Sequence, residues 1–263
     1  MGLLNNKKIL ITGISNKYSI AYGIAKSMYR EGAKLAFSYQ HDKLKLKVKK
    51  IALEFNSNIV FPCDVSKDSN IQNLFDSLYK KWKKYDGFVH SIAYSPKNQL
   101  SGQDYVNSIN RKDFSITHDI SSYSFVAMAK ISRSMLNSNS SLVTLTYFGS
   151  NRVIPNYNIM GLAKASLEAN TKYMANSMGK DGIRVNAISS GPIKTLSSSG
   201  IKNFKKILHL CKKINPISRL ITTEDIGNVA VFLCSDLSSG ITGEILNVNG
   251  GFNIFGIYDI NNK

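Results

Sequence analysis

Two residues seven positions apart, Tyr157 and Lys164, carry side chains that together could stabilise a developing negative charge. A phenol can donate a hydrogen bond to an oxyanion, and an ammonium group nearby stabilises the same charge. Seven residues make nearly two turns of an α-helix, so a helix through this segment would place both side chains on one face. The spacing therefore predicts a pair suited to oxyanion chemistry, although such a pair in isolation is more often ordinary surface.

A second tyrosine, Tyr147, precedes Tyr157 by ten residues. Thr146 and Tyr147 end an apolar run that we expect to be a buried strand. The Tyr147 phenol would then face the same crevice as Tyr157, because open α/β sheets bind ligands outside the carboxyl ends of their strands. The alternative interpretation of Tyr147 is a core aromatic that closes the end of the sheet.

Short apolar runs and amphipathic segments alternate along the 263 residues of the chain. Apolar runs without polar alternation indicate strands buried on both faces, and strand–helix repetition indicates right-handed crossovers between parallel strands. We therefore expect an α/β fold in which a doubly wound (Rossmann), mostly parallel sheet of seven strands carries helices on both faces. The expected strands are Lys8–Thr12, Lys34–Tyr39, Asn58–Cys63, Gly87–Ile92, Ser141–Tyr147, Arg184–Ser189 and Glu244–Val248, and the expected helices lie near 20–31, 42–55, 67–84, 113–136, 158–179 and 223–234.

One segment, near 193–216, departs from this alternation. It is long and rich in Ser and Lys, and we expect it to form a mobile helical flap over the substrate. No internal repeat, low-complexity tract or linker divides the chain elsewhere, which predicts a single dinucleotide-binding catalytic domain over residues 1–263.

The first expected strand ends in a turn that could bind a dinucleotide. Gly13 permits a tight turn at the carboxyl end of the strand, and Ser19 can start the next helix. The backbone amides at the positive end of that helix could bind a pyrophosphate. Gly13 and Gly23 are the glycines of this stretch, so G-x-G-x-x-G is absent, and the segment alone is as readily an ordinary turn.

The next two expected strands end in residues that could bind the adenosine half. Gln40 is neutral and can hydrogen-bond ribose hydroxyls without supplying charge for a 2′-phosphate, which favours NADH, although His41 and Lys43 leave NADPH open. Asp64 could accept a hydrogen bond from the adenine amino group, or it could cap the following helix. The turn from Ser189 to Thr195 has a backbone that could bind the nicotinamide amide.

Taken together, these residues resemble the enoyl-acyl-carrier-protein reductases of bacterial fatty acid synthesis, within the short-chain dehydrogenase/reductase superfamily. Ketone-reducing members of the superfamily carry Tyr-x-x-x-Lys. Here Gly161 stands four residues after Tyr157, and the wider enoyl-reductase spacing to Lys164 is found instead. The resemblance covers essentially the whole chain, and its most specific segments are Ser19–Gly23, His90–Ile92, His118–Phe125, Pro155–Asn170 and Arg184–Ser189.

The resemblance implies an oxidoreductase of fatty acid biosynthesis, and so of lipid metabolism. It would use NADH to reduce the trans-2 double bond of enoyl-acyl-carrier-protein thioesters, the last step of the elongation cycle. The catalytic residues would be Tyr147, Tyr157 and Lys164. The residues that contact NADH would be Gly13, Ser19, Ile20, Gln40, Asp64, Val65, Ile92, Lys164, Ile193 and Thr195, and those that bind the acyl substrate would be Ser95, Tyr147 and Tyr157.

Two positions depart from the family pattern. Ala93 stands where the family usually has glycine, so its methyl group would crowd the nicotinamide pocket. Ser95 replaces a small apolar residue, and because the family uses the backbone at this position, we expect little change.

The net charge of +17 is unusual for an enzyme of this size. Compositional bias towards Lys accounts for most of it, and a polyanionic partner is the alternative. Carrier proteins are acidic, so we expect Lys202, Lys205 and Lys206 on the flap to contact the acyl carrier protein. We expect no nucleic-acid partner, because the sequence contains no recognition motif. The family is generally tetrameric, so the resemblance implies a homotetramer, and the apolar tail at 251–258 is compatible with an interface.

The remaining features exclude other classes. No apolar run approaches the roughly 20 residues of a membrane helix, and the first residues lack the long apolar core of a signal peptide, so we expect a cytoplasmic protein with no membrane partner. Cys63, Cys211 and Cys234 are predicted to be free thiols, and the scattered histidines predict no metal site. Two alternatives stay open: a short-chain reductase acting on a ketone or secondary alcohol, and a basic nucleic-acid-binding protein on a non-catalytic dinucleotide fold.

Overall fold

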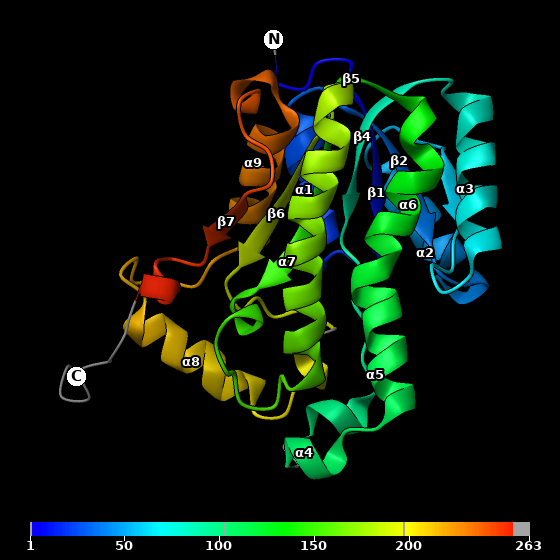
Figure 1. Cartoon of the computed structure of the whole chain (residues 1–263). Coiled ribbons are helices and arrows are strands. Elements are labelled where there is room, and N and C mark those ends of the chain that lie inside the picture. The colour runs from blue at the N-terminus through cyan, green and yellow to red at the C-terminus, as the bar shows by residue number, and fades with distance from the viewer. Residues whose placement is uncertain (1, 102–103, 197, 255–263) are drawn as a thin grey trace.

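A parallel sheet of seven strands forms the centre of the computed structural model, which describes residues 2–101, 104–196 and 198–254 (Figure 1). The strand order is β3-β2-β1-β4-β5-β6-β7, and every pairing between neighbours is parallel. This order reverses between β1 and β4, as in a doubly wound sheet, so the predicted fold class is confirmed. The strands are β1 (Lys8–Thr12), β2 (Lys34–Tyr39), β3 (Val60–Pro62), β4 (Tyr85–His90), β5 (Leu136–Tyr147), β6 (Arg184–Ser190) and β7 (Ile245–Val248).

Helices cover both faces of the sheet and give it two apolar cores. Ile9 and Ile11 of β1 pack into one core with α1, α2 and α9, whereas Leu10 packs into the other with α3, α6 and α7. All three side chains are fully buried, which explains why the strand reads as an unbroken apolar run. The helices are α1 (Ile20–Arg30), α2 (Asp42–Leu53), α3 (Asp68–Lys81), α4 (Tyr105–Ser108), α5 (Arg111–His118), α6 (Ser124–Ser132), α7 (Ile159–Met178), α8 (Phe204–Ile214) and α9 (Thr223–Cys234).

The segment predicted as one helix over 113–136 is divided. Helix α5 ends at His118, a π-helical turn follows at Asp119–Tyr123, and α6 continues from Ser124. The chain then enters β5 at Leu136, five residues before the predicted start of that strand. Helical periodicity persists across the π-helical turn, which is why the sequence pattern did not reveal the division.

Three further predictions concern the flap, the apolar tail and membrane association. The flap region is helical as predicted, since it contains α8, while its mobility stays a prediction. Of the apolar tail at 251–258, residues 255–258 lie outside the described residues. Within the described part of the chain, no helix is long and apolar enough to span a membrane.

Buried Arg184 joins the start of β6 to the end of α9. Its guanidinium donates to the carbonyl oxygens of Leu233 (2.8 Å) and Ser235 (3.1 Å) and to the hydroxyl of Ser238 (2.8 Å). The last carbonyls of a helix have no partner within the helix, and a cation there is favoured by the helix dipole. Arg184 begins one of the segments that carry the family resemblance, and this geometry gives it a structural role.

Arg184→Met should lower the free energy of unfolding by about 2–4 kcal/mol, because it removes three hydrogen bonds from a buried charged donor at the end of α9. The matched control is Arg152→Met, at an exposed position, which should change stability by less than about 0.5 kcal/mol. Urea unfolding of the two variants and the wild type measures both values. Equal stability of the two variants would show that Arg184 does not fasten α9 to the sheet.

Candidate active site

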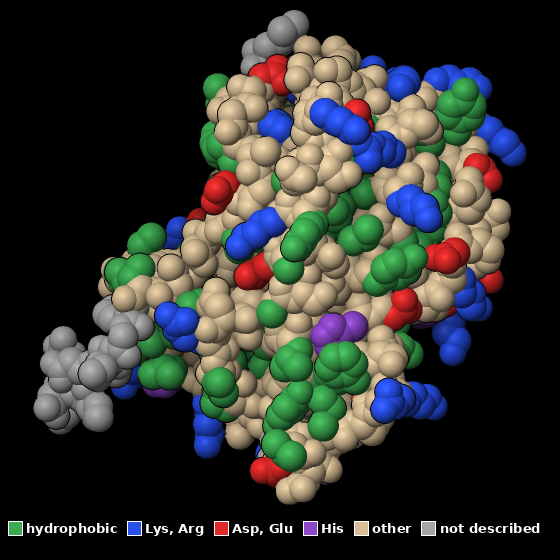
Figure 2. All heavy atoms as spheres, in the orientation of Figure 1, with side chains coloured by type: hydrophobic (Ala, Val, Ile, Leu, Met, Phe, Trp, Pro, Cys, Tyr) green, Lys and Arg blue, Asp and Glu red, His purple; other side chains and the backbone are tan. Residues whose placement is uncertain are grey.

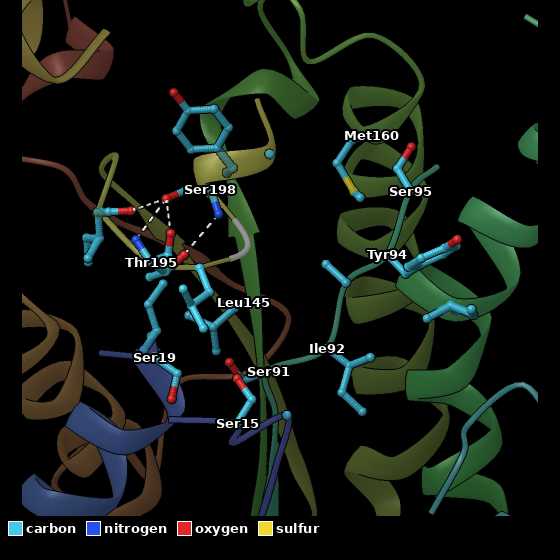
Figure 3. Close-up of a pocket in the computed structure, with 18 of the residues that line it drawn as sticks. Ser15, Ser19, Ser91, Ile92, Tyr94, Ser95, Leu145, Met160, Thr195 and Ser198 are labelled. Atoms are coloured by element: carbon cyan, nitrogen blue, oxygen red, sulfur yellow. Dashed lines mark hydrogen bonds between the residues drawn. The ribbon is translucent and has the colours of Figure 1, made fainter. Parts of the chain in front are cut away.

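A cavity of about 580 Å³ lies along the carboxyl ends of the strands (Figure 3). Residues that follow β1, β2, β3, β4 and β6 line it, together with the last residues of β5. It includes the point between β1 and β4 at which the strand order reverses, where open α/β sheets bind their ligands. The position of the cavity therefore marks it as the candidate site.

Every residue to which the sequence assigned a site role lines this one cavity. The fold brings these residues together because they lie at or just after the carboxyl ends of strands, or in the helices that follow those strands. What these residues bind stays a prediction from sequence. They are Gly13, Ser19, Ile20, Gln40, Asp64, Val65, Ile92, Ser95, Tyr147, Tyr157, Lys164, Ile193 and Thr195.

Other residues of the lining were not predicted. The apolar ones among them include Leu100 and Met160, which form one cluster with Tyr157, and Ile201, which packs against that cluster. No motif identifies such residues, but two signals could have found them: adjacency to Ser95, and the inner face of the expected flap. They include Tyr94, Leu100, Met160, Leu196, Ile201 and Phe204.

The turn after β1 presents bare backbone to the cavity. Gly13 has φ +81°, and a Cβ there would lie 1.9 Å from the carbonyl oxygen of Ser91, so no other residue fits. Ser19 caps α1, because its hydroxyl oxygen accepts from the Tyr22 amide at 3.3 Å. The amino end of α1 thus faces the cavity with its partial positive charge, an arrangement that suits a phosphate group.

Asp64 is not the helix cap of its alternative predicted role, because the N-cap residue of α3 is Lys67. Its Oδ1 accepts hydrogen bonds from the amide (3.2 Å) and the hydroxyl (2.9 Å) of Ser66, which stabilises the turn before α3. Asp64 also lines the cavity. One residue can therefore hold the turn and still face a ligand.

The prediction that Tyr157 and Lys164 share one face of a helix is wrong. Helix α7 begins at Ile159, and Tyr157 lies in the turn before it, between Asn156 (φ +67°) and Asn158 (φ +41°). Asparagine is among the residues that adopt positive φ most readily, so these two residues tighten the chain ahead of the helix. Tyr157 and Lys164 nevertheless line the same cavity, so the predicted convergence holds although its geometric reason does not.

The packing around Tyr157 also explains the glycine at 161. A Cβ on Gly161 would lie 2.6 Å from the carbonyl oxygen of Gly149, and a Cβ on Gly149 would lie 2.5 Å from Cδ1 of Tyr157. A side chain at position 161 would displace the segment that carries the phenol. The lysine of a Tyr-x-x-x-Lys pair therefore does not fit this site.

The two phenol rings pack against each other in the wall of the cavity. The rings of Tyr147 and Tyr157 meet edge to face with centroids 5.0 Å apart. Burial raises the pKa of both phenols well above the ordinary value, and the nearby Glu168 contributes to the rise for Tyr157. Among the described residues, the Tyr147 hydroxyl is buried without a hydrogen-bond partner. Both phenols stay protonated at neutral pH and can donate to a ligand.

Lys164 is buried, with 5% of its surface exposed, beside the end of β5. Its Nζ donates to the carbonyl oxygen of Leu145 at 2.7 Å. Burial lowers the pKa of Lys164 to about 8, and Glu168 opposes this shift. The Glu168 carboxylate is itself held by the Thr146 hydroxyl, at 2.7 Å. Lys164 is therefore mostly charged at neutral pH, close to the point at which it loses its proton.

The flap closes one side of the cavity. The Ser198 hydroxyl oxygen accepts from the Thr195 amide (2.8 Å) and donates to the Ile193 carbonyl (2.9 Å), as Figure 3 shows in part. The Lys202 amide then donates to the Leu100 carbonyl at 3.1 Å. Figure 3 places Met160, Tyr94 and Ser95 on one side of the cavity and Ser15, Ser19 and Thr195 on the other.

Among the residues that the structure describes, the remaining reactive groups do not form a second centre. Cys63, Cys211 and Cys234 are buried free thiols. In the described ranges, no group of three or more His, Cys, Asp and Glu side chains is placed to hold a metal ion. Ala93 lines the cavity, so its methyl group lies at the site, as the sequence suggested.

Comparison with known proteins agrees with the resemblance seen in the sequence. The family described as Enoyl-(Acyl carrier protein) reductase matches residues 13–253. A curated protein of Escherichia coli (strain K12), named enoyl-[acyl-carrier-protein] reductase [NADH] FabI, is 59% identical over 263 residues, which is 100% of both chains. A protein of the same name from Buchnera aphidicola subsp. Baizongia pistaciae is 63% identical over 254 residues, 97% of each chain.

A solved structure gives the same result for the fold. The crystal structure of enoyl-[acyl-carrier-protein] reductase (NADH) from Aquifex aeolicus VF5 superposes with a TM-score of 0.94 at 46% sequence identity. The match covers 98% of this chain and 100% of that chain. Sequence and fold therefore agree over nearly the whole length.

The depressed pKa of Lys164 predicts how stability depends on pH. The folded protein releases the Lys164 proton near pH 8, whereas the unfolded chain keeps it up to the ordinary value of 10.5. The unfolded state thus binds more protons in this window, so stability rises with pH. Relative to Lys164→Met, the wild type should gain about 1 kcal/mol of unfolding free energy between about pH 7 and about pH 9.

Urea unfolding of wild type and Lys164→Met at the two pH values measures this gain, and the difference between the proteins cancels groups that titrate in both. A difference that stays constant with pH, or shrinks, would contradict the burial of a titrating lysine.

Proposed function

The chain belongs to the enoyl-acyl-carrier-protein reductase family, and from that premise we propose how its residues carry out the reaction. It is an oxidoreductase that uses NADH to reduce the trans-2 double bond of enoyl thioesters in fatty acid biosynthesis. The observation that carries the assignment of roles is the convergence of Tyr147, Tyr157 and Lys164 on one cavity.

The residues present fit a dinucleotide. Gly13 leaves no room for a side chain, and the amino end of α1 behind Ser19 offers unpaired amides to a pyrophosphate. Gln40 would bind the adenosine ribose and Asp64 the adenine. Lys164 would bind the nicotinamide ribose hydroxyls. When bound, NADH supplies a hydride to C3 of the enoyl thioester. The further contacts that we propose come from Ile20, Val65, Ile92, Ile193 and Thr195.

Tyr157 would donate a hydrogen bond to the thioester oxygen, on which negative charge gathers during reduction. Its raised pKa keeps the phenol protonated, so the donor is present throughout the neutral range. Lys164 adds positive potential from a site of low exposure, where a charge is screened less than in water. Tyr147 would pack against Tyr157 and, with Ser95, border the acyl chain.

The geometry disfavours a ketone or secondary alcohol as the substrate. The lysine position of ketone-reducing members is occupied by Gly161, where the backbone of Gly149 excludes a side chain. Relatives that match the whole chain are enoyl reductases. A crotonyl thioester and an acetoacetyl thioester, assayed in parallel with NADH, separate the two activities.

We propose that the enzyme acts in the cytoplasm as a homotetramer. Apolar side chains on α5 and α7 are exposed, and Figure 2 shows hydrophobic groups gathered on the face that these helices present. Burying such a patch against another copy would remove it from water. Its members include Phe114, Leu162 and Tyr173, which are 39%, 40% and 79% exposed.

We also propose that the flap presents a basic surface to the acyl carrier protein. Lys202, Lys205 and Lys206 are exposed and lie beside Ile201 and Phe204, which line the cavity. Helix α8 begins at Phe204, so Lys202 precedes the helix on which it was expected. Positive charge at the entrance would orient an acidic carrier so that its acyl chain enters the cavity.

Tyr157→Phe should lower kcat for a crotonyl thioester by two to three orders of magnitude, since loss of one such donor typically costs about 3–4 kcal/mol. The dissociation constant of NADH should not change. Tyr79→Phe, at an exposed position on α3, is the matched control and should behave as the wild type. Unchanged kcat in Tyr157→Phe would contradict the proposed role.

Charge reversal at Lys202, Lys205 and Lys206 to Glu should raise KM for the carrier-bound substrate about tenfold at low salt. KM for a small crotonyl thioester should stay the same, because that substrate lacks the acidic carrier. Reversal of Lys80, Lys81 and Lys83, exposed residues in and just after α3, gives the same change in net charge. If both triple variants raise KM equally, net charge and not a docking surface is responsible.

A further inference from the structure

The π-helical turn between α5 and α6, Asp119–Tyr123, directs buried serines to different elements. Ser121, Ser122 and the following Ser124 are 0%, 2% and 0% exposed. Each hydroxyl binds outside its own turn: Ser121 contacts the loop after β4, Ser122 contacts α7, and Ser124 contacts His90 of β4. A π turn inside an α-helix is rare and often marks a functional position.

Ser121 binds both backbone groups of a single residue in the cavity wall. Its hydroxyl oxygen accepts from the Tyr94 amide at 2.9 Å and donates to the Tyr94 carbonyl at 3.0 Å. Residues 91–96, all within the described part of the chain, adopt no regular secondary structure. Ser121 thus supplies the donor and the acceptor that a neighbouring strand would otherwise provide.

The other two serines do not touch this loop. The Ser122 hydroxyl lies 2.8 Å from that of Ser166 and accepts a hydrogen bond from the side-chain Nδ2 of Asn170 at 2.9 Å, so it fastens the turn to α7. Ser124 donates to the Ile120 carbonyl at 2.7 Å. Among these three serines, Ser121 alone therefore binds the backbone of the loop at Tyr94.

We propose that Ser121 is a positioning residue for the acyl substrate: it fixes the backbone of Tyr94 and so the wall that Tyr94 and Ser95 form. The inference rests on the proposed function of the cavity. Figure 3 shows Tyr94 and Ser95 near Met160, away from Ser15 and Ser19. We call the two hydrogen bonds between Ser121 and the Tyr94 backbone the clamp. Without the clamp, the loop samples several conformations, and the acyl chain binds only the fraction of molecules in which the wall is in place. The affinity for substrate falls in proportion to that fraction.

Ser121→Ala in the full-length enzyme should raise KM for a crotonyl thioester about tenfold, since the loss of a buried hydroxyl leaves two backbone groups unpaired. The dissociation constant of NADH, measured by fluorescence, should change less than about twofold, because the cofactor side of the cavity keeps its contacts. Ser122→Ala removes a hydroxyl of the same turn and should leave both constants at the wild-type values. A general loss of structure would instead weaken both ligands together.

Amide hydrogen exchange tests the clamp without any assay of activity. The Tyr94 amide of the wild type should be protected at least about tenfold relative to an unstructured peptide, and this protection should be lost in Ser121→Ala and kept in Ser122→Ala. An unprotected Tyr94 amide in the wild type would overturn the proposal, and this measurement needs no variant to fold. An unchanged crotonyl KM in Ser121→Ala would overturn it as well. If the wild type did not reduce the thioester at all, the proposed function would fail, while the exchange result would still decide the clamp.

Discussion

Three consecutive residues at the carboxyl end of β5 each contact a different side chain of α7 or of the turn before it. The Leu145 carbonyl binds the Lys164 ammonium, the Thr146 hydroxyl binds Glu168, and the Tyr147 ring packs against Tyr157. Because β5 is paired on both edges, by β4 and β6, these three contacts are made from a strand that the sheet holds in place on both sides. The rest of the structure serves to keep α7 and the turn before it against this strand end.

Burial gives the same site two opposite electrostatic effects. It raises the pKa of both phenols, which keeps them protonated as donors, and it lowers the pKa of Lys164 to about 8. Glu168 opposes the second effect, so the lysine stays mostly charged at neutral pH. A charge in a site of low exposure interacts more strongly with a developing oxyanion than the same charge in water. The cost of burying Lys164 and the effect that we propose for it in the reaction thus have one cause.

The sequence predicted the seven strands and the doubly wound fold class well, because buried parallel strands read as apolar runs and the residues expected to contact NADH follow their ends. It failed where backbone geometry departs from a repeating pattern. Positive φ at Asn156 and Asn158 moved Tyr157 off the helix, and the π-helical turn at Asp119–Tyr123 interrupted a segment whose periodicity continues. Apolar lining residues such as Phe204 carry no motif, and a place on the expected flap or next to Ser95 was the signal that the sequence offered for them.

The most direct measurement is a crystal structure of the enzyme with NAD and an unreactive analogue of the enoyl thioester. We expect the Tyr157 hydroxyl to lie within about 2.6–3.2 Å of the thioester oxygen, the range in which a phenol can donate a hydrogen bond, with Lys164 beside the nicotinamide ribose. A thioester oxygen bound by other groups, with the Tyr157 hydroxyl turned away from it, would contradict the account.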